Sequence, residues 1–287
     1  MSESTPEALA ELIGAYLVVQ CGVLAESEAA LRAGKNVIHR TRVAARRLRS
    51  TLKVFEDLFE GPRAAWMDSE LQWWAAVLGA VRDLDVLEHR LGASLDALPD
   101  ELVLGPVRTE LAETVAVRRQ RARADLGAAL DSTRYRQLAA SIGAWTEAPP
   151  FTAAADRKAG KAARYVKRAD RQVANRLAAA VEAYRTGDPE AGELLHRARK
   201  AGKRHRYAAE ALEPIWGAKA EKVVNRRKEL QELLGDHQDS VVAGEFLRDV
   251  GAGQGSAEGR NGFTWGVLYG QELATGDRVV TELKRFQ

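Results

Sequence analysis

Residues 39–53 read HRTRVAARRLRSTLK, and this stretch decides how the rest of the chain is interpreted. It contains no acid, glycine or proline, so nothing in it interrupts a helix. Side chains three, four and seven residues apart share a face of a helix. One basic row therefore forms, made of His39, Arg42, Arg46, Arg49 and Lys53. The other side, which a helix turns toward a hydrophobic core, carries Ile38, Ala45, Leu48, Leu52 and Phe55.

The basic row has no carboxylate of its own to balance it. Like charges at helical spacing repel each other by about 0.2–0.5 kcal/mol per pair unless an anion or a paired acid lies near them. Two interpretations stay open from this stretch alone. The row is either a solvated basic face balanced by acids elsewhere in the fold, or a binding face for an extended anion.

The row occurs a second time in the chain. Residues 196–207 read HRARKAGKRHRY and align with the first stretch after a shift of 157 residues. The aligned pairs are His39 with His196, Arg42 with Arg199, Arg46 with Lys203, Arg47 with Arg204, and Arg49 with Arg206. A second signature follows each row, LGAVRD from residue 78 and LGDHQD from residue 234, at separations of 39 and 38 residues from the histidine. Two linked motifs in the same order indicate an internal duplication.

Together these motifs resemble the CHAD family, the histidine-containing α-helical domain. The resemblance covers about residues 10 to 250 and rests on both rows and on the two Leu-Gly-x-x-x-Asp segments that end at Asp83 and Asp239. It implies a wholly helical domain of two similar bundles, with inorganic polyphosphate bound in a basic channel between them. The halves are not fully equivalent, because Gln238 and His205 stand where the first half has Arg82 and Leu48.

The expected fold class is all-α: two pseudo-symmetric antiparallel helical bundles from an internal duplication, with a basic channel between them. No segment shows sustained strand alternation bounded by turns. We expect a single domain over residues 1–287, with half one at 1–148 and half two at 151–287. The boundary is Pro149-Pro150, which falls between the repeats.

Several element boundaries are predicted from turn residues. In the first half, a helix carries Trp73 and Trp74, which we interpret as core residues, and Gly79 breaks its pattern; a loop follows from Ala93 to Gly105. In the second half, a helix spans Asp156 to Thr186, and a flexible loop runs from Gly251 to Gly259 before the last helix.

Composition is nearly balanced, but the charges are segregated. Forty-three Lys and Arg face 40 Asp and Glu, for a net charge of +3. Residues 32–53 hold eight bases and no acid, whereas residues 56–101 hold eleven acids and three bases, and a ligand meets the local field. The single Cys21 excludes an internal disulfide and favours a reducing compartment. The acidic N-terminal segment lacks a basic n-region, and the longest uncharged run, Leu12 to Ala25, is shorter than a membrane span of about 20 residues.

Polyphosphate is a line of negative charges without bases, so its receptor needs positive charge repeated along a line. Arg offers planar paired donors for phosphate oxygens and Lys a mobile point charge. Both rows, with basic residues on neighbouring helices, make up the predicted polyphosphate-binding set: His39, Arg42, Arg46, Arg47, Arg49, Lys53, Lys161, Arg164, Arg168, His196, Arg199, Lys203, Arg204, Arg206, Lys222 and Arg226.

The histidines and aspartates of the motifs leave alternatives open. His39 and His196 either donate a ring N–H to phosphate or tie their helices to a neighbour. His205 aligns with a core leucine and is expected to be a core histidine with its hydrogen bonds satisfied. Asp83 and Asp239 are expected to orient arginines or cap helices in preference to binding a metal.

Two other functions compete with polyphosphate binding. Nucleic acid also presents a line of phosphates, but single-strand binders add stacking aromatics, and Tyr207 is the one aromatic within either row. A metal-dependent phosphohydrolase would need ligand spacings or a nucleophile beside a base, which the sequence lacks. We therefore expect a binding protein with no catalytic residue, metal or cofactor, located in the cytoplasm and at polyphosphate granules, without membrane contact. Its oligomeric state stays open.

Overall fold

The computed structural model describes residues 5–254 and 262–286, and these form an all-α fold, as predicted. Within these residues strand-like pairing is limited to isolated bridges, Ala8 with Lys158 and Phe59 with Phe151. The α-helices are α1 (Leu9–Arg32), α2 (Ile38–Val54), α3 (Gly61–Asp96), α4 (Val107–Asp131), α5 (Thr133–Glu147), α6 (Ala162–Thr186), α7 (Ala191–Glu210), α8 (Glu213–Trp216), α9 (Ala218–Gln254) and α10 (Phe263–Leu283). The 3-10 turns are η1 (Glu56–Leu58), η2 (Asp100–Leu102), η3 (Ala153–Asp156), η4 (Ala159–Lys161) and η5 (Lys284–Phe286).

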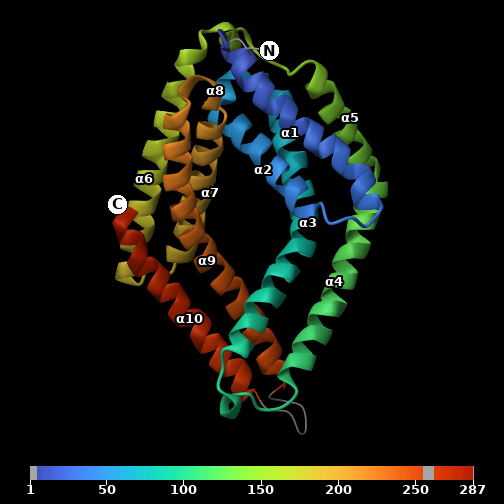
Figure 1. Ribbon diagram of the computed structural model, residues 1–287, viewed down its shortest axis with the longest axis vertical. Coiled ribbons are helices and arrows are strands. Elements are labelled where there is room, and N and C mark those ends of the chain that lie inside the picture. Colours follow the sequence, from blue (N-terminus) through green and yellow to red (C-terminus); the bar gives the residue numbers. More distant parts are fainter. Residues whose placement is uncertain (1–4, 255–261, 287) are drawn as a thin grey trace.

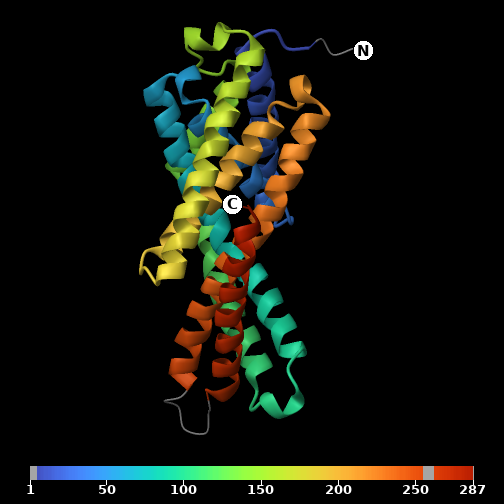
Figure 2. The ribbon, with the colours of Figure 1, turned by 90° about the vertical axis from the view of Figure 1, so that its left-hand side faces the viewer.

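The two halves of the chain lie side by side in an elongated molecule (Figures 1 and 2). In the lower part of Figure 1, α3 and α9 cross between α4 on the right and α10 on the left, and all four helices meet at the lower end. A core cluster at that end combines Leu91 and Leu95 of α3 with Phe246 of α9 and Trp265 of α10. The halves therefore share packed side chains there. The pseudo-symmetry of two similar bundles stays a prediction.

The two motif helices, α2 and α7, pack against each other where the halves meet. Ala45, Leu48 and Leu52 of α2 are at most 3% exposed and belong to the largest core cluster, as the sequence predicted for this face. Ala208 and Ala209 at the end of α7 are buried in the same cluster. The core thus holds the two basic rows at a fixed position relative to each other.

Helix α1 is long and apolar enough to cross a membrane by length and composition, and 44% of its most apolar 18-residue window is buried. The criterion of an unbroken uncharged run missed this property, because Glu11 and Glu26 bound that run. Leu9, Ile13 and Leu17 are fully buried and belong to the largest core cluster. In this structure, α1 is a core helix.

Several predicted boundaries are wrong. Gly79 lies inside α3, which continues to Asp96 and so takes in the start of the expected loop from residue 93. The helix expected from Asp156 begins only at Ala162, after two 3-10 turns. Helix α9 runs on to Gln254 through the first part of the loop expected at 251–259, and residues 255–259 lie outside the described residues. Since glycine costs a helix only about 1 kcal/mol, tertiary packing overrides it.

Candidate anion-binding site

Two contiguous cavities, of about 340 Å³ and 610 Å³, lie between α2 and α3 on one side and α7 and α9 on the other. Arg42, Arg46, His196 and Arg199 line both, so we treat the cavities together as the groove. Its Lys and Arg residues are Arg42, Arg46, Arg49, Lys53, Arg82, Arg90, Arg199, Lys200, Lys203 and Arg204. The acids in its lining are Asp68, Asp83 and Asp239. Positive charge therefore dominates the groove.

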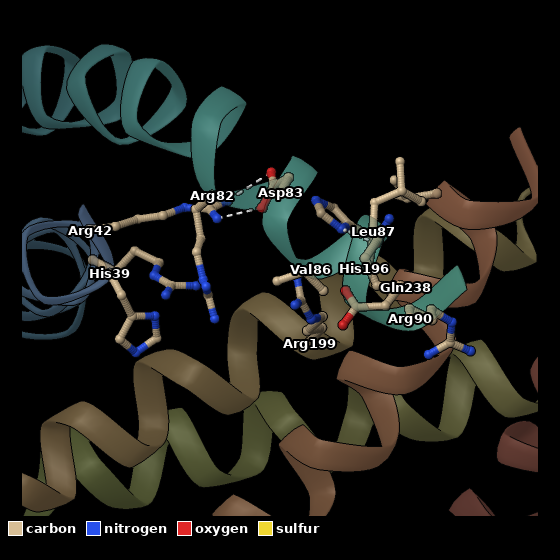
Figure 3. Close-up of a pocket in the computed structure, with 13 residues that line it drawn as sticks. His39, Arg42, Arg82, Asp83, Val86, Leu87, Arg90, His196, Arg199 and Gln238 are labelled. Atoms are coloured by element: carbon tan, nitrogen blue, oxygen red, sulfur yellow. Dashed lines mark hydrogen bonds and ion pairs between the residues drawn. The ribbon is translucent and has the colours of Figure 1, made fainter. Parts of the chain in front are cut away.

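On the first wall of the groove, acids of α3 answer part of the row on α2. Arg42 forks onto Asp83, with Nη1 2.5 Å from Oδ1 and Nη2 3.2 Å from Oδ2 (Figure 3). Arg49 donates through Nε to Asp68 at 2.9 Å, and Lys53 lies 3.5 Å from the same carboxylate. This bears out the expectation that Asp83 orients an arginine.

Arg46 lies between these paired residues, and within residues 5–254 and 262–286 it forms no ion pair with a carboxylate. Its Nε is buried without a hydrogen-bond acceptor. Burial lowers the pKa of Arg46, and the positive charges of Arg42 and Arg199 lower it further. Arg46 is thus a half-buried cation among cations, with a buried donor that an incoming anion can satisfy.

The second wall, on α7, carries cations with less compensation. The Nε of Arg199 is also buried without an acceptor, and burial lowers its pKa. Burial and the neighbouring charges of Arg199, Arg46 and Arg42 lower the pKa of Lys203 to about 6. Within the described part of the chain, no carboxylate forms an ion pair with Arg199, Lys203 or Arg204. This wall is therefore the less neutralised of the two.

The two motif histidines lie in the lining but differ in their surroundings. The Nδ1 of His196 lies 2.9 Å from Oε1 of Gln238, which ties α7 to α9. His39 lies near Arg82, and burial together with the charges of Arg82, Arg46 and Arg42 lowers its pKa (Figure 3). The contact with Gln238 supports the helix-tying role for His196; because His196 also lines the groove, donation to phosphate stays a prediction.

Arg47 and Arg206 lie outside both cavities, at a cluster around Glu210. Arg47 donates through Nε to Oε2 of Glu210 at 3.0 Å, and Arg206 Nε lies 3.5 Å from Oε1. Tyr16 of α1 donates its hydroxyl to the same carboxylate at 3.2 Å. The guanidinium groups of Arg47 and Arg206 both lie over the ring of Tyr207, 5.6 Å and 4.7 Å from its centroid. We call this set the Glu210 clamp, because it joins α2 to α7.

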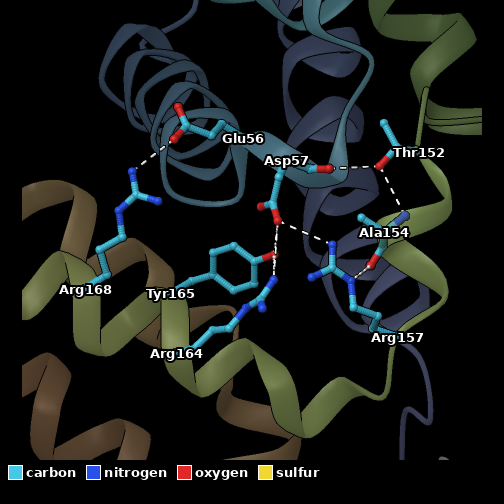
Figure 4. A network of polar contacts seen from close by, with 8 residues as sticks. All are labelled: Glu56, Asp57, Thr152, Ala154, Arg157, Arg164, Tyr165 and Arg168. Carbon is cyan, nitrogen blue, oxygen red and sulfur yellow. Dashed lines mark hydrogen bonds and ion pairs between the residues drawn. The ribbon is translucent and has the colours of Figure 1, made fainter.

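The predicted residues of α6 face η1 and not the groove. Arg164 and Tyr165 both donate to the Asp57 carboxylate, and Arg168 donates to Glu56 at 3.0 Å (Figure 4). A smaller cavity of about 160 Å³ neighbours the groove and shares two lining residues with it, Lys53 and Arg204. Arg168 and Arg176 line the smaller cavity.

Other predicted residues lie outside all three cavities. Lys161 ends the turn η4, and Lys222 and Arg226 are exposed on the first part of α9. The structure brings these predicted residues together in the groove: His39, Arg42, Arg46, Arg49, Lys53, His196, Arg199, Lys203 and Arg204. His205 is 3% exposed and accepts a hydrogen bond from Arg227 at 3.0 Å, as expected for a satisfied core histidine.

Sequence reasoning missed Arg82, Arg90, Lys200 and Arg176 as lining residues. Arg82 lies inside the segment LGAVRD and Lys200 inside the second basic row, so the motifs themselves indicated both residues. Arg82, Val86 and Arg90 follow one another at four-residue spacing on one face of α3, which is a second signal. In the described residues, no group of three or more His, Cys, Asp or Glu side chains is arranged to hold a metal ion.

Comparisons with known proteins agree with this architecture. The CHAD domain model matches residues 15–248. Two proteins of Mycobacterium tuberculosis, the uncharacterized proteins MT2285 and Rv2226, are each 36% identical over 260 residues, which is 87% of this chain and 47% of the relative. The chain thus spans about half the length of these curated relatives.

Solved structures show the same fold. PptA from Streptomyces chartreusis superposes with a TM-score of 0.82 at 20% identity, covering 98% of both chains. The CHAD domain from the plant Ricinus communis superposes with a TM-score of 0.70 at 26% identity, covering 99% of this chain and 94% of that one.

Proposed function

The chain belongs to the CHAD family, and from this premise we propose that it binds inorganic polyphosphate in the groove without reacting with it. Some members of the family bind polyphosphate. One observation carries the proposal for this chain: Arg46 of α2 and Arg199 of α7 line the same cavities, and each has a buried Nε without an acceptor. A chain of phosphates would supply the missing charge and the missing acceptors at once.

Clustered cations and unsatisfied donors in the groove cost the folded protein free energy. A buried donor without an acceptor costs about 1–3 kcal/mol, and clustered cations add Coulomb repulsion. Phosphate oxygens accept charge-assisted hydrogen bonds from arginine in paired geometry. Because several cations follow one another along the groove, a linear polyanion gains more from it than an isolated phosphate does.

Nucleic acid is the second candidate, because its phosphates would meet the same charges. Its bases would need stacking surfaces. Tyr207, which lines the groove, is 2% exposed, and two guanidinium groups lie over its ring. Trp73 and Trp74 do not line the groove. These observations favour a ligand without bases.

Binding without catalysis fits a role in targeting or scaffolding at polyphosphate, in the cytoplasm and at polyphosphate granules. CHAD is not an established catalytic family. The groove lining offers arginine, lysine and histidine side chains to an anion, but its three aspartates come from separate positions and form no metal-binding group in the described chain. We expect no hydrolysis of polyphosphate, ATP or triphosphate with Mg²⁺ or Mn²⁺ present.

Direct titration tests the proposal. Long-chain polyphosphate and single-stranded DNA of matched charge are titrated into the protein at physiological salt, and polyphosphate should bind more tightly, with affinity that falls as salt rises. Arg199→Glu should weaken binding strongly, whereas the control Arg121→Glu, which reverses an exposed charge on α4 outside the groove, should change it little. Equal affinity for DNA, or equal effects of the two variants, would overturn the proposal.

A further inference from the structure

Arg42 reaches from α2 across to α3, where a glycine leaves room for it. A Cβ placed on Gly79 would lie 3.1 Å from Nη2, 3.3 Å from Cζ and 3.5 Å from Nε of Arg42. Gly79 is buried in the middle of α3, where no positive φ or turn requires glycine. The space that its missing side chain leaves is filled by the Arg42 guanidinium.

One turn further along α3, Asp83 fixes the end of the same guanidinium. The fork onto Asp83 uses one N–H of each terminal nitrogen, so three of the five N–H donors of Arg42 remain. Arg42 lines both cavities of the groove, and Figure 3 shows it in the lining of the first. Gly79 and Asp83 therefore hold a partly free guanidinium at the place where the two cavities join.

The duplicated signature does not repeat this arrangement. Gly235 occupies the position of Gly79 in the second LGxxxD segment, but a Cβ placed on it would meet nothing within 4 Å. In the described chain, no hydrogen bond or ion pair joins Arg199 to Asp239, the counterparts of Arg42 and Asp83. The signature glycine thus packs closely against an arginine in the first half, whereas in the second half the space beside it is open.

We propose that Gly79 is a positioning residue for ligand binding: its missing side chain and the Asp83 carboxylate together preset Arg42 for contact with polyphosphate. This inference rests on the proposed function. A side chain that is already ordered in the free protein loses less conformational entropy when the ligand binds. An alanine at position 79 would force the guanidinium to shift by a few tenths of an ångström, which would distort the fork onto Asp83 and reduce this advantage.

The expected effects differ between the two glycines. Gly79→Ala should weaken polyphosphate binding about threefold to tenfold, which is about 0.7–1.4 kcal/mol at 1.4 kcal/mol per factor of ten. Gly235→Ala should leave affinity unchanged and should stabilise the fold, because alanine favours a helix interior. Each variant is compared with the wild-type protein by calorimetric titration of long-chain polyphosphate and by thermal unfolding.

A double-mutant cycle separates positioning from general damage to the helix. If Gly79 acts through Arg42, Gly79→Ala should have no further effect on affinity in an Arg42→Ala background. Unchanged affinity of Gly79→Ala would overturn this inference alone, as would an equal loss with and without Arg42. Absence of polyphosphate binding by the wild-type protein would overturn the proposed function and this inference with it.

Discussion

Arg46 of α2 and Arg199 of α7 line the same two cavities. Burial of Arg46 lowers its pKa, and the positive charge of Arg199 lowers it further. Both have a buried Nε without an acceptor. Two helices that pack against each other thus bring like charges together at the centre of the molecule. Such an arrangement destabilises the free protein and favours an anion between the two rows.

Two arginines on one face of α3 should differ in their roles: we expect Arg90 to contribute mainly to stability and Arg82 mainly to polyphosphate binding. Arg90 donates to the Glu272 carboxylate, which is 4% exposed, and to Asp236, so each of its three guanidinium nitrogens is paired with a carboxylate although it lines the groove. Arg90→Met would leave the Glu272 charge buried without its partner and should cost about 3 kcal/mol or more of unfolding free energy. Arg82 pairs with the carboxylate of Asp85 at 3.8 Å. Arg82→Met should cost little stability but should weaken polyphosphate binding more than Arg90→Met does.

Urea unfolding and polyphosphate titration of both variants check this ranking. Arg82 and Arg90 carry the same charge on the same helix, so each serves as the control for the other. A ranking in which Arg90→Met is the milder change for stability and the more severe for affinity would contradict the assignment of Arg90 to structural support.

Lys203 should make binding dependent on pH. Burial and the charges of Arg199, Arg46 and Arg42 lower its pKa to about 6, with Asp239 opposing the shift, so its amine is mostly neutral at pH 7.5 in the free protein. An anion in the groove favours the charged form, so binding should take up a proton and affinity should rise as pH falls from about 8 to 6. Calorimetry in two buffers of different ionisation enthalpy measures this uptake.

The same lowered pKa affects stability with a defined sign. Between about pH 6 and the ordinary lysine pKa near 10.4, the unfolded chain binds the proton that folded Lys203 lacks, so this group makes the folded state more stable as pH rises through that range. Lys203→Gln should remove this contribution and most of the proton uptake on binding. His39, whose pKa is also lowered, is the other candidate, and uptake that survives Lys203→Gln but disappears in His39→Gln would refute the assignment.

The Glu210 clamp should stabilise the fold, and its arginines should not add to the positive charge that lines the groove. Glu210→Gln would leave Arg47 and Arg206 beside a neutral amide. Because about two thirds of the Arg47 side chain is shielded from water, we expect the change to lower the free energy of unfolding by about 1.5–3 kcal/mol. Glu182→Gln, which removes an exposed partner of Arg185, should change stability little. Urea unfolding at pH 7 compares the two variants. A loss in Glu210→Gln no larger than that in Glu182→Gln would contradict a stabilising role for the Glu210 clamp.

The sequence predicted the helical class and the central part of the groove, because both depend on periodicity within one helix. Arg42, Arg46 and Arg49 share a face by spacing alone, and their duplicates on α7 were found by alignment. The partners of each arginine depend on which helix lies opposite, which spacing does not reveal. Arg47 and Arg206 belong to the same motifs, yet the approach of Glu210 and Tyr207 takes them out of the groove.

Long-range contacts also explain the other residues whose positions the sequence predicted wrongly or did not predict. Arg164 and Arg168 have the spacing of a basic row, but their helix faces the acids of η1. Arg90 meets Glu272, a residue 182 positions away in the chain. Gly79 reads as a helix breaker in isolation, and only the guanidinium packed against it shows why glycine is there.

The two rows should act on one ligand. Arg46 and Lys203 align in the duplication and lie in the same groove on α2 and α7. Reversing either charge with Arg46→Glu or Lys203→Glu both removes an attraction and adds a repulsion, so each change should cost more affinity than a neutral substitution. If one polyphosphate chain contacts both rows, each variant should weaken binding of the whole chain, by about tenfold or more for a charge-assisted contact of 1.5–3 kcal/mol.

Two independent sites would behave differently from a shared groove. In that case each variant would keep one site of normal affinity and lose half of the stoichiometry. Calorimetry with a polyphosphate long enough to contact both rows separates these outcomes, with circular dichroism to show that each variant stays folded and Arg121→Glu as the charge-reversal control. Half stoichiometry at unchanged affinity would refute the shared groove, whereas full stoichiometry at reduced affinity in both variants would support it, because contacts along a continuous ligand are lost together.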